Sequence, residues 1–276
     1  MADRRVPSGQ HPAVRWTFRI LVTAYLFLLV AWPVSLVVRK TFDGGLTHLR
    51  GITEDPDVVH ALRLTIVVAL AAVVINTVFG VGISLLLVRY EFPGRRLLSA
   101  FVNLPLSVSP IVVGLSLVLV YGGRGGWFGP TLEEAGFRVI FATPAIIMAT
   151  AFVALPLVVR EVVPVLEEVG IEQEQAARSL GASSVQTFRR ITLPTIRWAV
   201  VYGVVLSLAR SLGEFGAVKV VSGNVLGQTR TATLVVEEKY LNFDQGGAYA
   251  TAFLLALVSV ACIVIVSIIR PREQQA

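Results

Sequence analysis

The sequence QAARSLGASSVQTFRRITLP, residues 175–194, is the longest polar and charged stretch of an otherwise apolar chain. Its residues predict a polar hairpin of two short helices. Gly181 can adopt the left-handed conformation that ends a helix, and Ser183 with Gln186 three residues later has the pattern of a capping box. Pro194 marks an expected boundary before the next apolar run. Because so polar a hairpin cannot lie in hydrocarbon, we expect it to project from a membrane toward a soluble partner.

The composition indicates a membrane protein. The chain has 276 residues, of which 55% are hydrophobic and 15% are charged, whereas a soluble domain has about 25% charged residues. Six apolar runs are each close to the ~20 residues that a spanning helix needs. We therefore expect an all-α membrane protein with six transmembrane helices. The runs cover residues 18–38, 64–88, 97–121, 140–159, 198–220 and 248–269.

The predicted domain organisation is a short tail followed by one membrane domain. Polar residues 1–15 are expected to form a loose cytoplasmic tail. Residues 16–276 are expected to form a single transmembrane domain, with a core over about 60–270. Within this domain, the loop that carries the polar hairpin covers about 160–197.

Lysine and arginine set the orientation, because they are more frequent in cytoplasmic loops. The ends and loops on the N-terminal side of the membrane carry 14 of them, and the opposite side carries nine. We therefore expect both termini and the polar hairpin to be cytoplasmic. The connections 40–63, 122–139 and 221–247 then lie outside. They are either ordinary solvated loops or the docking surface of a solute-binding protein.

The polar hairpin resembles the EAA loop of bacterial ABC-importer permeases, through Ala176-Ala177, Gly181, Ile191 and Leu193-Pro194. Gln175 stands where that family has Glu, and Glu174 precedes it. The resemblance implies the MetI-like permease fold, with a cytoplasmic coupling helix that sits in a cleft of a separate ATPase subunit. An ordinary cytoplasmic helical hairpin is the alternative. The residues that the resemblance assigns to ATPase coupling are Glu174, Gln175, Ala176, Ala177, Leu180, Gly181, Ala182 and Ser183.

Further blocks at residues 55–65, 92–95, 105–115, 158–166 and 189–224 resemble the sulfate/thiosulfate importer permeases, the W subunit more than its T partner. The resemblance implies a transport subunit in the bacterial inner membrane. It implies as partners a second homologous permease subunit, two ABC ATPase subunits, an extracytoplasmic sulfate-binding protein and membrane lipid. Related molybdate and tungstate permeases are the first alternative. A stand-alone channel or secondary transporter is the second, and the coupling loop and the lack of an obvious inverted repeat argue against it.

Arg210 and Glu214 are charged residues within the fifth apolar run. Four residues apart on one helix, they share a face and can pair. A charge at this depth costs about 2.5–3.5 kcal/mol on insertion scales. Two interpretations stay open: a structural ion pair that holds the helix bundle together, or a group beside the solute path, where Arg210 attracts an anion.

Ser107 and Ser109 lie in the third run, between Pro105 and Pro110. Each proline removes a backbone donor and can break the helix, and broken helices at membrane depth are tolerated where they line a cavity. The freed amides and the two hydroxyls could then bind an oxyanion in the substrate path. The alternative is a kinked packing helix whose serines bond to the backbone.

The chain has no motif typical of an enzyme. The glycine-rich residues 122–130 lack the Lys-Ser/Thr of a phosphate-binding loop, so we expect ATP and Mg²⁺ to be used by the partner ATPase and no cofactor to be bound by this chain. The three histidines, at positions 11, 48 and 60, lack metal-ligand spacing. No cluster of basic residues is interleaved with aromatics, which argues against a nucleic-acid partner.

Overall fold

The computed structural model describes the backbone of residues 12–268 and the side chains of residues 16–265. Every secondary-structure element in this part is a helix, which confirms the all-α prediction. The predicted tail lies mostly outside the described residues, as does the C-terminal end whose cytoplasmic location was predicted. Helix α1 begins at Pro12, so the last residues assigned to the tail are helical.

The helices follow one another with short connections. Two π-helical turns, η1 and η2, interrupt longer helices. In chain order the elements are α1 Pro12–Leu26, η1 Phe27–Ala31, α2 Trp32–Phe42, α3 Thr47–Glu54, α4 Pro56–Arg89, α5 Arg95–Ser107, α6 Pro110–Tyr121, α7 Gly129–Glu134, α8 Thr143–Val169, α9 Glu172–Ser179, α10 Ser184–Thr187, η2 Phe188–Thr192, α11 Leu193–Leu212, α12 Gly216–Val221, α13 Ala232–Leu241 and α14 Gln245–Ile268.

Five helices of the described chain are long and apolar enough to cross a membrane, and a bent pair makes up to six. The bent pair is α5 and α6, which meet at 116°. The third run is therefore no straight helix, because Pro110 starts a new one. The fifth run is shorter than predicted: it ends at Leu212, and residues 213–215 separate it from α12.

Glycine allows the three central helices to pack closely. Val158 of α8 is fully buried. A Cβ on Gly80 of α4 would come within 2.7 Å of its Cγ1 atom, and a Cβ on Gly203 of α11 within 2.9 Å of its Cα atom. A buried hydrogen bond from Asn76 Nδ2 to Ser207 Oγ, 3.3 Å long, also joins α4 to α11. These contacts make α4, α8 and α11 the core of the bundle.

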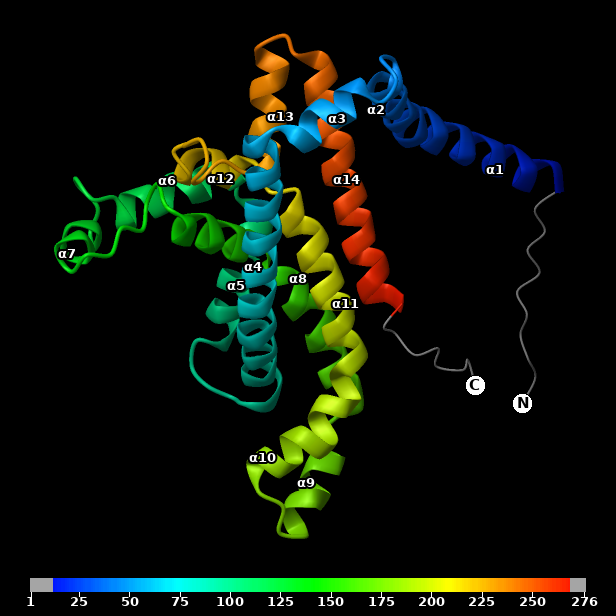
Figure 1. Ribbon diagram of the computed structural model, residues 1–276. Helices are drawn as coiled ribbons and strands as arrows, with labels where there is room; N and C mark the ends of the chain where they lie inside the picture. The colour runs from blue at the N-terminus through cyan, green and yellow to red at the C-terminus, as the bar shows by residue number, and fades with distance from the viewer. Residues whose placement is uncertain (1–11, 269–276) are drawn as a thin grey trace.

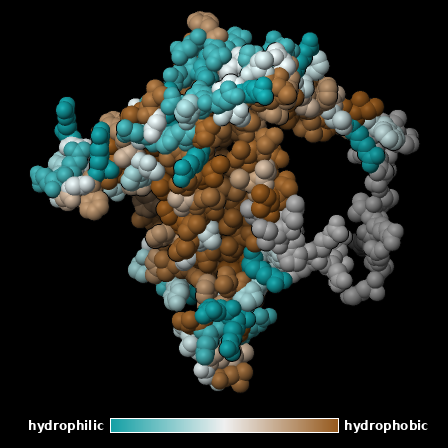
Figure 2. Space-filling model, viewed as in Figure 1, coloured by the Kyte–Doolittle hydropathy of each residue, from teal (hydrophilic) through white to brown (hydrophobic). Residues whose placement is uncertain are grey.

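The bundle has two polar ends and an apolar middle. Figure 1 shows α9 and α10 projecting at one end, and α3 and α13 at the other. Figure 2 shows a hydrophobic belt between hydrophilic ends, as expected for a membrane-spanning protein. Helix α1 extends away from the bundle (Figure 1), and none of the apolar window of the span Trp16–Phe42 is buried. Lipid or another subunit must therefore cover it.

Candidate functional site

The predicted hairpin is present at the end of the bundle. We call residues 172–187, that is α9, α10 and their turn, the coupling hairpin. Gly181 has φ +87°, in the left-handed region that favours glycine. The Ser183 hydroxyl accepts a hydrogen bond from the Gln186 amide at 3.3 Å, and Gln186 Oε1 accepts one from the Ser183 amide at 2.8 Å. The predicted turn and capping box are thus confirmed.

The boundary expected at Pro194 is a change of helix type and not a break in the helix. The chain stays helical from Ser184 to Leu212, over 29 residues. The π-helical turn η2 ends just before α11, which has this proline in its first turn. A π turn is wider than an α turn. We infer that this width leaves space for the proline ring and lets the helix continue without the amide donor that proline lacks. The coupling hairpin therefore joins the fifth span without a loop.

The far end of the coupling hairpin carries exposed apolar side chains. Leu180 is 90% exposed and Val185 is 66% exposed. Among the other residues assigned to ATPase coupling, Gln175 and Ala176 are exposed, whereas Ala177 is half-buried. The sequence reasoning did not single out Val185, although an apolar residue in so polar a stretch is itself a signal. An apolar tip on a polar hairpin fits a partner that has an apolar cleft.

Glu174 faces into the chain. Its carboxylate pairs with Arg89 at the end of α4 (Nε to Oε2 3.3 Å) and accepts a hydrogen bond from Thr192 Oγ1 at 2.9 Å. Arg89 also donates from Nη1 to the Leu166 carbonyl of α8 at 3.0 Å. The two charged side chains are 10% and 12% exposed. Glu174, which the resemblance assigns to ATPase coupling, belongs to a clasp that fastens the coupling hairpin to α4, α8 and η2.

The sequence reasoning missed Arg89 as a site residue. It was counted among the basic residues that set the orientation, which is the usual reason for an arginine at the end of a span. Its partner lies 85 residues further along the chain. No local pattern could have connected the two.

The two helix breaks lie next to each other. A Cβ on Gly216, the first residue of α12, would come within 3.1 Å of Pro110 Cβ at the start of α6. One turn on, a Cβ on Gly114 would come within 2.9 Å of the Ala217 carbonyl oxygen and 2.8 Å of Val220 Cβ. Helices α6 and α12 therefore run in the same direction and begin at the same level, and Figure 1 shows them side by side. The predicted break of the third run is confirmed.

Ser107 and Ser109 are exposed in this single chain, at the bend between α5 and α6. No side-chain hydrogen bond from either hydroxyl is found among the described residues. Some buried serines and threonines of the described chain bond back to the carbonyl four residues earlier, as Ser84 does to Gly80 at 2.7 Å and Thr65 does to Ala61 at 2.7 Å. The expected alternative of serines bonded to the backbone is thus not observed here.

Arg210 and Glu214 form a pair, but not along one helix. The guanidinium and carboxylate are 2.7 Å apart (Nη1 to Oε2), with Arg210 in α11 and Glu214 in the break after it. The other carboxylate oxygen accepts a hydrogen bond from the Ala217 amide at 2.9 Å, and Thr233 Oγ1 donates to the Glu214 carbonyl at 3.0 Å. The expected shared helix face is wrong, because α11 ends at Leu212 and the Glu214 carboxylate instead accepts from the Ala217 amide in the first turn of α12.

The environments of the two charges differ. The Glu214 side chain is 2% exposed and its oxygens are held by Arg210 and the start of α12, whereas the Arg210 side chain is 37% exposed. Helix α12 links this pair to the serine bend, because its first residue packs on Pro110. The two helix breaks thus place the partly exposed guanidinium of Arg210 and the hydroxyls of Ser107 and Ser109 at a similar level along the bundle. No direct contact joins Arg210 to either serine.

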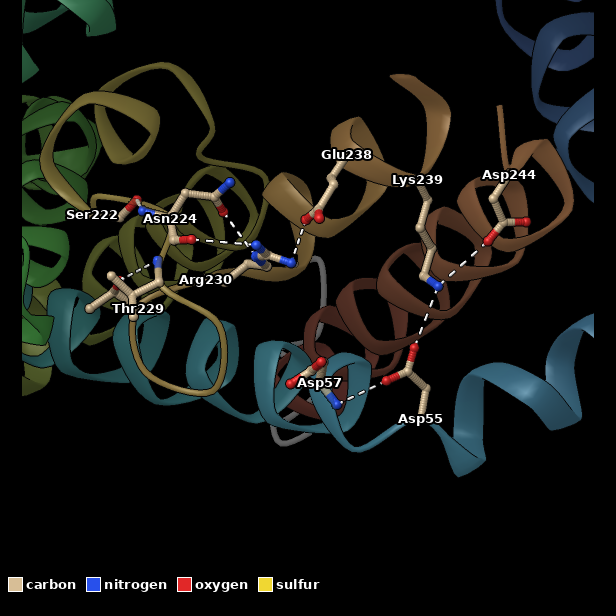
Figure 3. Close-up of polar contacts among 10 residues, drawn as sticks. Asp55, Asp57, Ser222, Asn224, Thr229, Arg230, Glu238, Lys239 and Asp244 are labelled. Carbon is tan, nitrogen blue, oxygen red and sulfur yellow. Dashed lines mark hydrogen bonds and ion pairs between the residues drawn. The ribbon is translucent and has the colours of Figure 1, made fainter. Parts of the chain in front are cut away.

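The opposite end of the bundle is also tied together by charge. Figure 3 shows Lys239 between Asp55 and Asp244, with Nζ–Oδ2 distances of 3.4 and 3.5 Å, and Arg230 paired with Glu238. These pairs join α13 to the start of α4 and to the segment before α14. The predicted outer connection 221–247 is therefore largely a folded cap.

Comparisons with known proteins agree with this architecture. Residues 76–275 match the family described as binding-protein-dependent transport system inner membrane component. The chain is 44% identical over 259 residues to the sulfate transport system permease protein CysW of Synechocystis sp., covering 94% of each chain. It is 41% identical to CysW of Escherichia coli K12, covering 92% of this chain and 86% of that one. The crystal structure of a bacterial ABC transporter that imports the acidic polysaccharide alginate matches with TM-score 0.78 at 14% identity, over 93% of this chain and 94% of that one.

Proposed function

Because the chain belongs to the family of binding-protein-dependent transport system inner membrane components, we propose that it is a permease subunit of an ATP-driven importer for sulfate or thiosulfate. The coupling hairpin carries this proposal, since its apolar tip projects from the bundle and its base is clasped to three helical elements. Relatives at 41–44% identity that are named sulfate permeases support the substrate. A molybdate or tungstate permease is the competing assignment.

In this proposal the coupling hairpin transmits movement of the ATPase to the spans. The continuous helix Ser184–Leu212 joins the hairpin to Arg210, and the Arg89 clasp joins it to α4 and α8. A displacement of the coupling hairpin would then also move the adjoining helix breaks. ATP can drive this change only by binding one of the two conformations more tightly than the other.

The solute path is proposed to pass the two helix breaks. Arg210 would attract the anion, and the free hydroxyls of Ser107 and Ser109 would offer hydrogen-bond donors to its oxygens. Glu214 would reduce the charge of Arg210, so that a dianion is released as well as bound.

The proposed assembly follows from the same family. This chain would pair with a second, homologous permease subunit, two ATPase subunits that use ATP and Mg²⁺, and an extracytoplasmic sulfate-binding protein. It would lie in the bacterial inner membrane with both termini in the cytoplasm, and would bind no cofactor itself.

Uptake measurements test this proposal. A strain that lacks the chain should lose uptake of labelled sulfate and regain it with the intact chain, but not with Leu180→Asp, which puts a charge on the apolar tip. Thr53→Asp, at an exposed position at the other end of the bundle, is the matched control. Loss of molybdate uptake with normal sulfate uptake would reverse the substrate assignment. Normal sulfate uptake by Leu180→Asp would overturn the role of the hairpin.

A further inference from the structure

A cavity of about 550 Å³ lies between the end of α4, the first half of α5 and the second half of α8. It is separate from the helix breaks and from the tip of the coupling hairpin. One part of its wall is apolar, formed by Leu87 and Val163, and another is basic. The basic residues are Arg95, Arg96 and Arg160.

The three arginines are not neutralised within the described chain. None of them forms an ion pair with a described carboxylate, and Arg160 donates from Nε to the Asn103 side-chain oxygen at 3.1 Å. Glu167 is the one acidic residue that lines the cavity. The cavity therefore keeps a positive balance and several guanidinium donors for an anion.

The cavity sits where the apolar belt meets a polar end. Helix α5 begins at Arg95, and within two turns it exposes Leu97 (61%) and Phe101 (58%). On the other side, α8 continues from Arg160 to its end just before the coupling hairpin. Leu87 of the cavity wall lies two residues before Arg89, which pairs with Glu174 of the coupling hairpin. The cavity thus lies toward the hairpin end of the bundle, where the hydrophobic belt of Figure 2 gives way to hydrophilic residues. A ligand there meets charge at one end and hydrocarbon at the other.

We propose that this cavity binds the headgroup of an anionic phospholipid. Arginine forks hold phosphate oxygens in a two-pronged geometry, and basic pockets between spanning helices at the cytoplasmic side bind such headgroups. The acyl chains would follow the apolar wall at Val163 and the exposed Pro164. A free sulfate or phosphate ion has the same oxyanion chemistry but has nothing to place against that wall.

The test measures retained lipid. The complete complex, purified with its partner subunits, is placed in phosphatidylcholine vesicles that contain labelled phosphatidylglycerol. After washing in detergent, the labelled lipid per complex is counted by native mass spectrometry. Arg95→Gln/Arg96→Gln/Arg160→Gln should retain at least tenfold less, since each basic side chain near an anionic surface contributes roughly fivefold. The matched control removes three positive charges from residues of α9 and η2 that do not line the cavity: Arg178→Gln/Arg189→Gln/Arg190→Gln.

A second variant separates the cavity from its charge. Ser99 lines the cavity, and Ser99→Phe fills it while all three arginines remain. This variant should also lose the lipid. Equal retention by the arginine variant and its control would overturn the proposal. So would displacement of the label by phosphate or sulfate at constant ionic strength, because the site would then hold a free anion. Neither readout depends on which solute is transported.

Discussion

Arg89 fixes the orientation of the coupling hairpin through one side chain. It reaches the Glu174 carboxylate and the Leu166 carbonyl from a nearly buried position. The guanidinium has several donors in a rigid fork. Lysine has a compact ammonium group instead of this planar fork, so it cannot make both contacts with the same geometry.

Replacing Arg89 should uncouple ATP hydrolysis from transport. In Arg89→Gln the Glu174 carboxylate loses its charged partner, and the coupling hairpin loses its tie to α4. The ATPase still finds the apolar tip, so we expect hydrolysis to continue while sulfate uptake falls about tenfold, the equivalent of one 1.4 kcal/mol interaction. The measurement is ATP hydrolysed per sulfate transported in reconstituted vesicles. Arg178→Gln, an exposed arginine of the same hairpin, is the control. An unchanged ratio in Arg89→Gln would refute the clasp.

The Arg210–Glu214 pair allows the structural and transport interpretations to be separated. Arg210→Met leaves the carboxylate buried without its cation, and breaking a buried pair costs about 3–5 kcal/mol, so little protein should reach the membrane. Arg210→Met/Glu214→Gln should restore the protein level, because the Gln oxygen can still accept from the Ala217 amide. We expect sulfate uptake per inserted protein to remain low in the double variant. Near-normal sulfate uptake by the double variant would show that the Arg210–Glu214 pair serves packing and not transport.

The turn of the coupling hairpin depends on backbone conformation and not on space. Nothing lies within 4 Å of a Cβ built on Gly181, but its φ is +87°. Gly181→Val should therefore disrupt the turn, because a β-branched residue rarely adopts positive φ. Gly181→Asn should be tolerated, since asparagine visits this region. Co-purification of the ATPase should be lost with Val and kept with Asn. Equal co-purification by both would show that the turn geometry is unimportant.

Local sequence patterns predicted which helices and turns form better than they predicted the residues at which the helices begin and end. The capping box at Ser183 and the break at Pro110 are each determined by residues a few positions apart, so a short stretch of sequence is enough to predict them. The end of α11 at Leu212 depends on the Glu214 carboxylate accepting from the Ala217 amide and on Gly216 packing against α6, which only the assembled bundle provides. The clasp at Arg89 and the lipid cavity likewise join segments distant in the sequence.

The orientation of the whole molecule rests on an asymmetry of 14 basic residues against nine, and it can be measured directly. Cys262 is the one cysteine of the sequence and is partly buried, so Cys262→Ala gives a background for labelling. Ser184 suits a probe better than Ser183, because the Ser183 hydroxyl holds the cap. Gln228 is exposed at the opposite end of the bundle.

A membrane-impermeant thiol reagent should label Gln228→Cys in intact cells and Ser184→Cys only after the cells are opened. Because a docked ATPase would shield the hairpin, Glu91→Cys, exposed between α4 and α5, serves as a second cytoplasmic probe. It should respond to opening even when Ser184→Cys stays protected. Labelling of Glu91→Cys in intact cells would invert the topology. The hairpin would then face away from the ATP, and no ATPase in the cytoplasm could act on it.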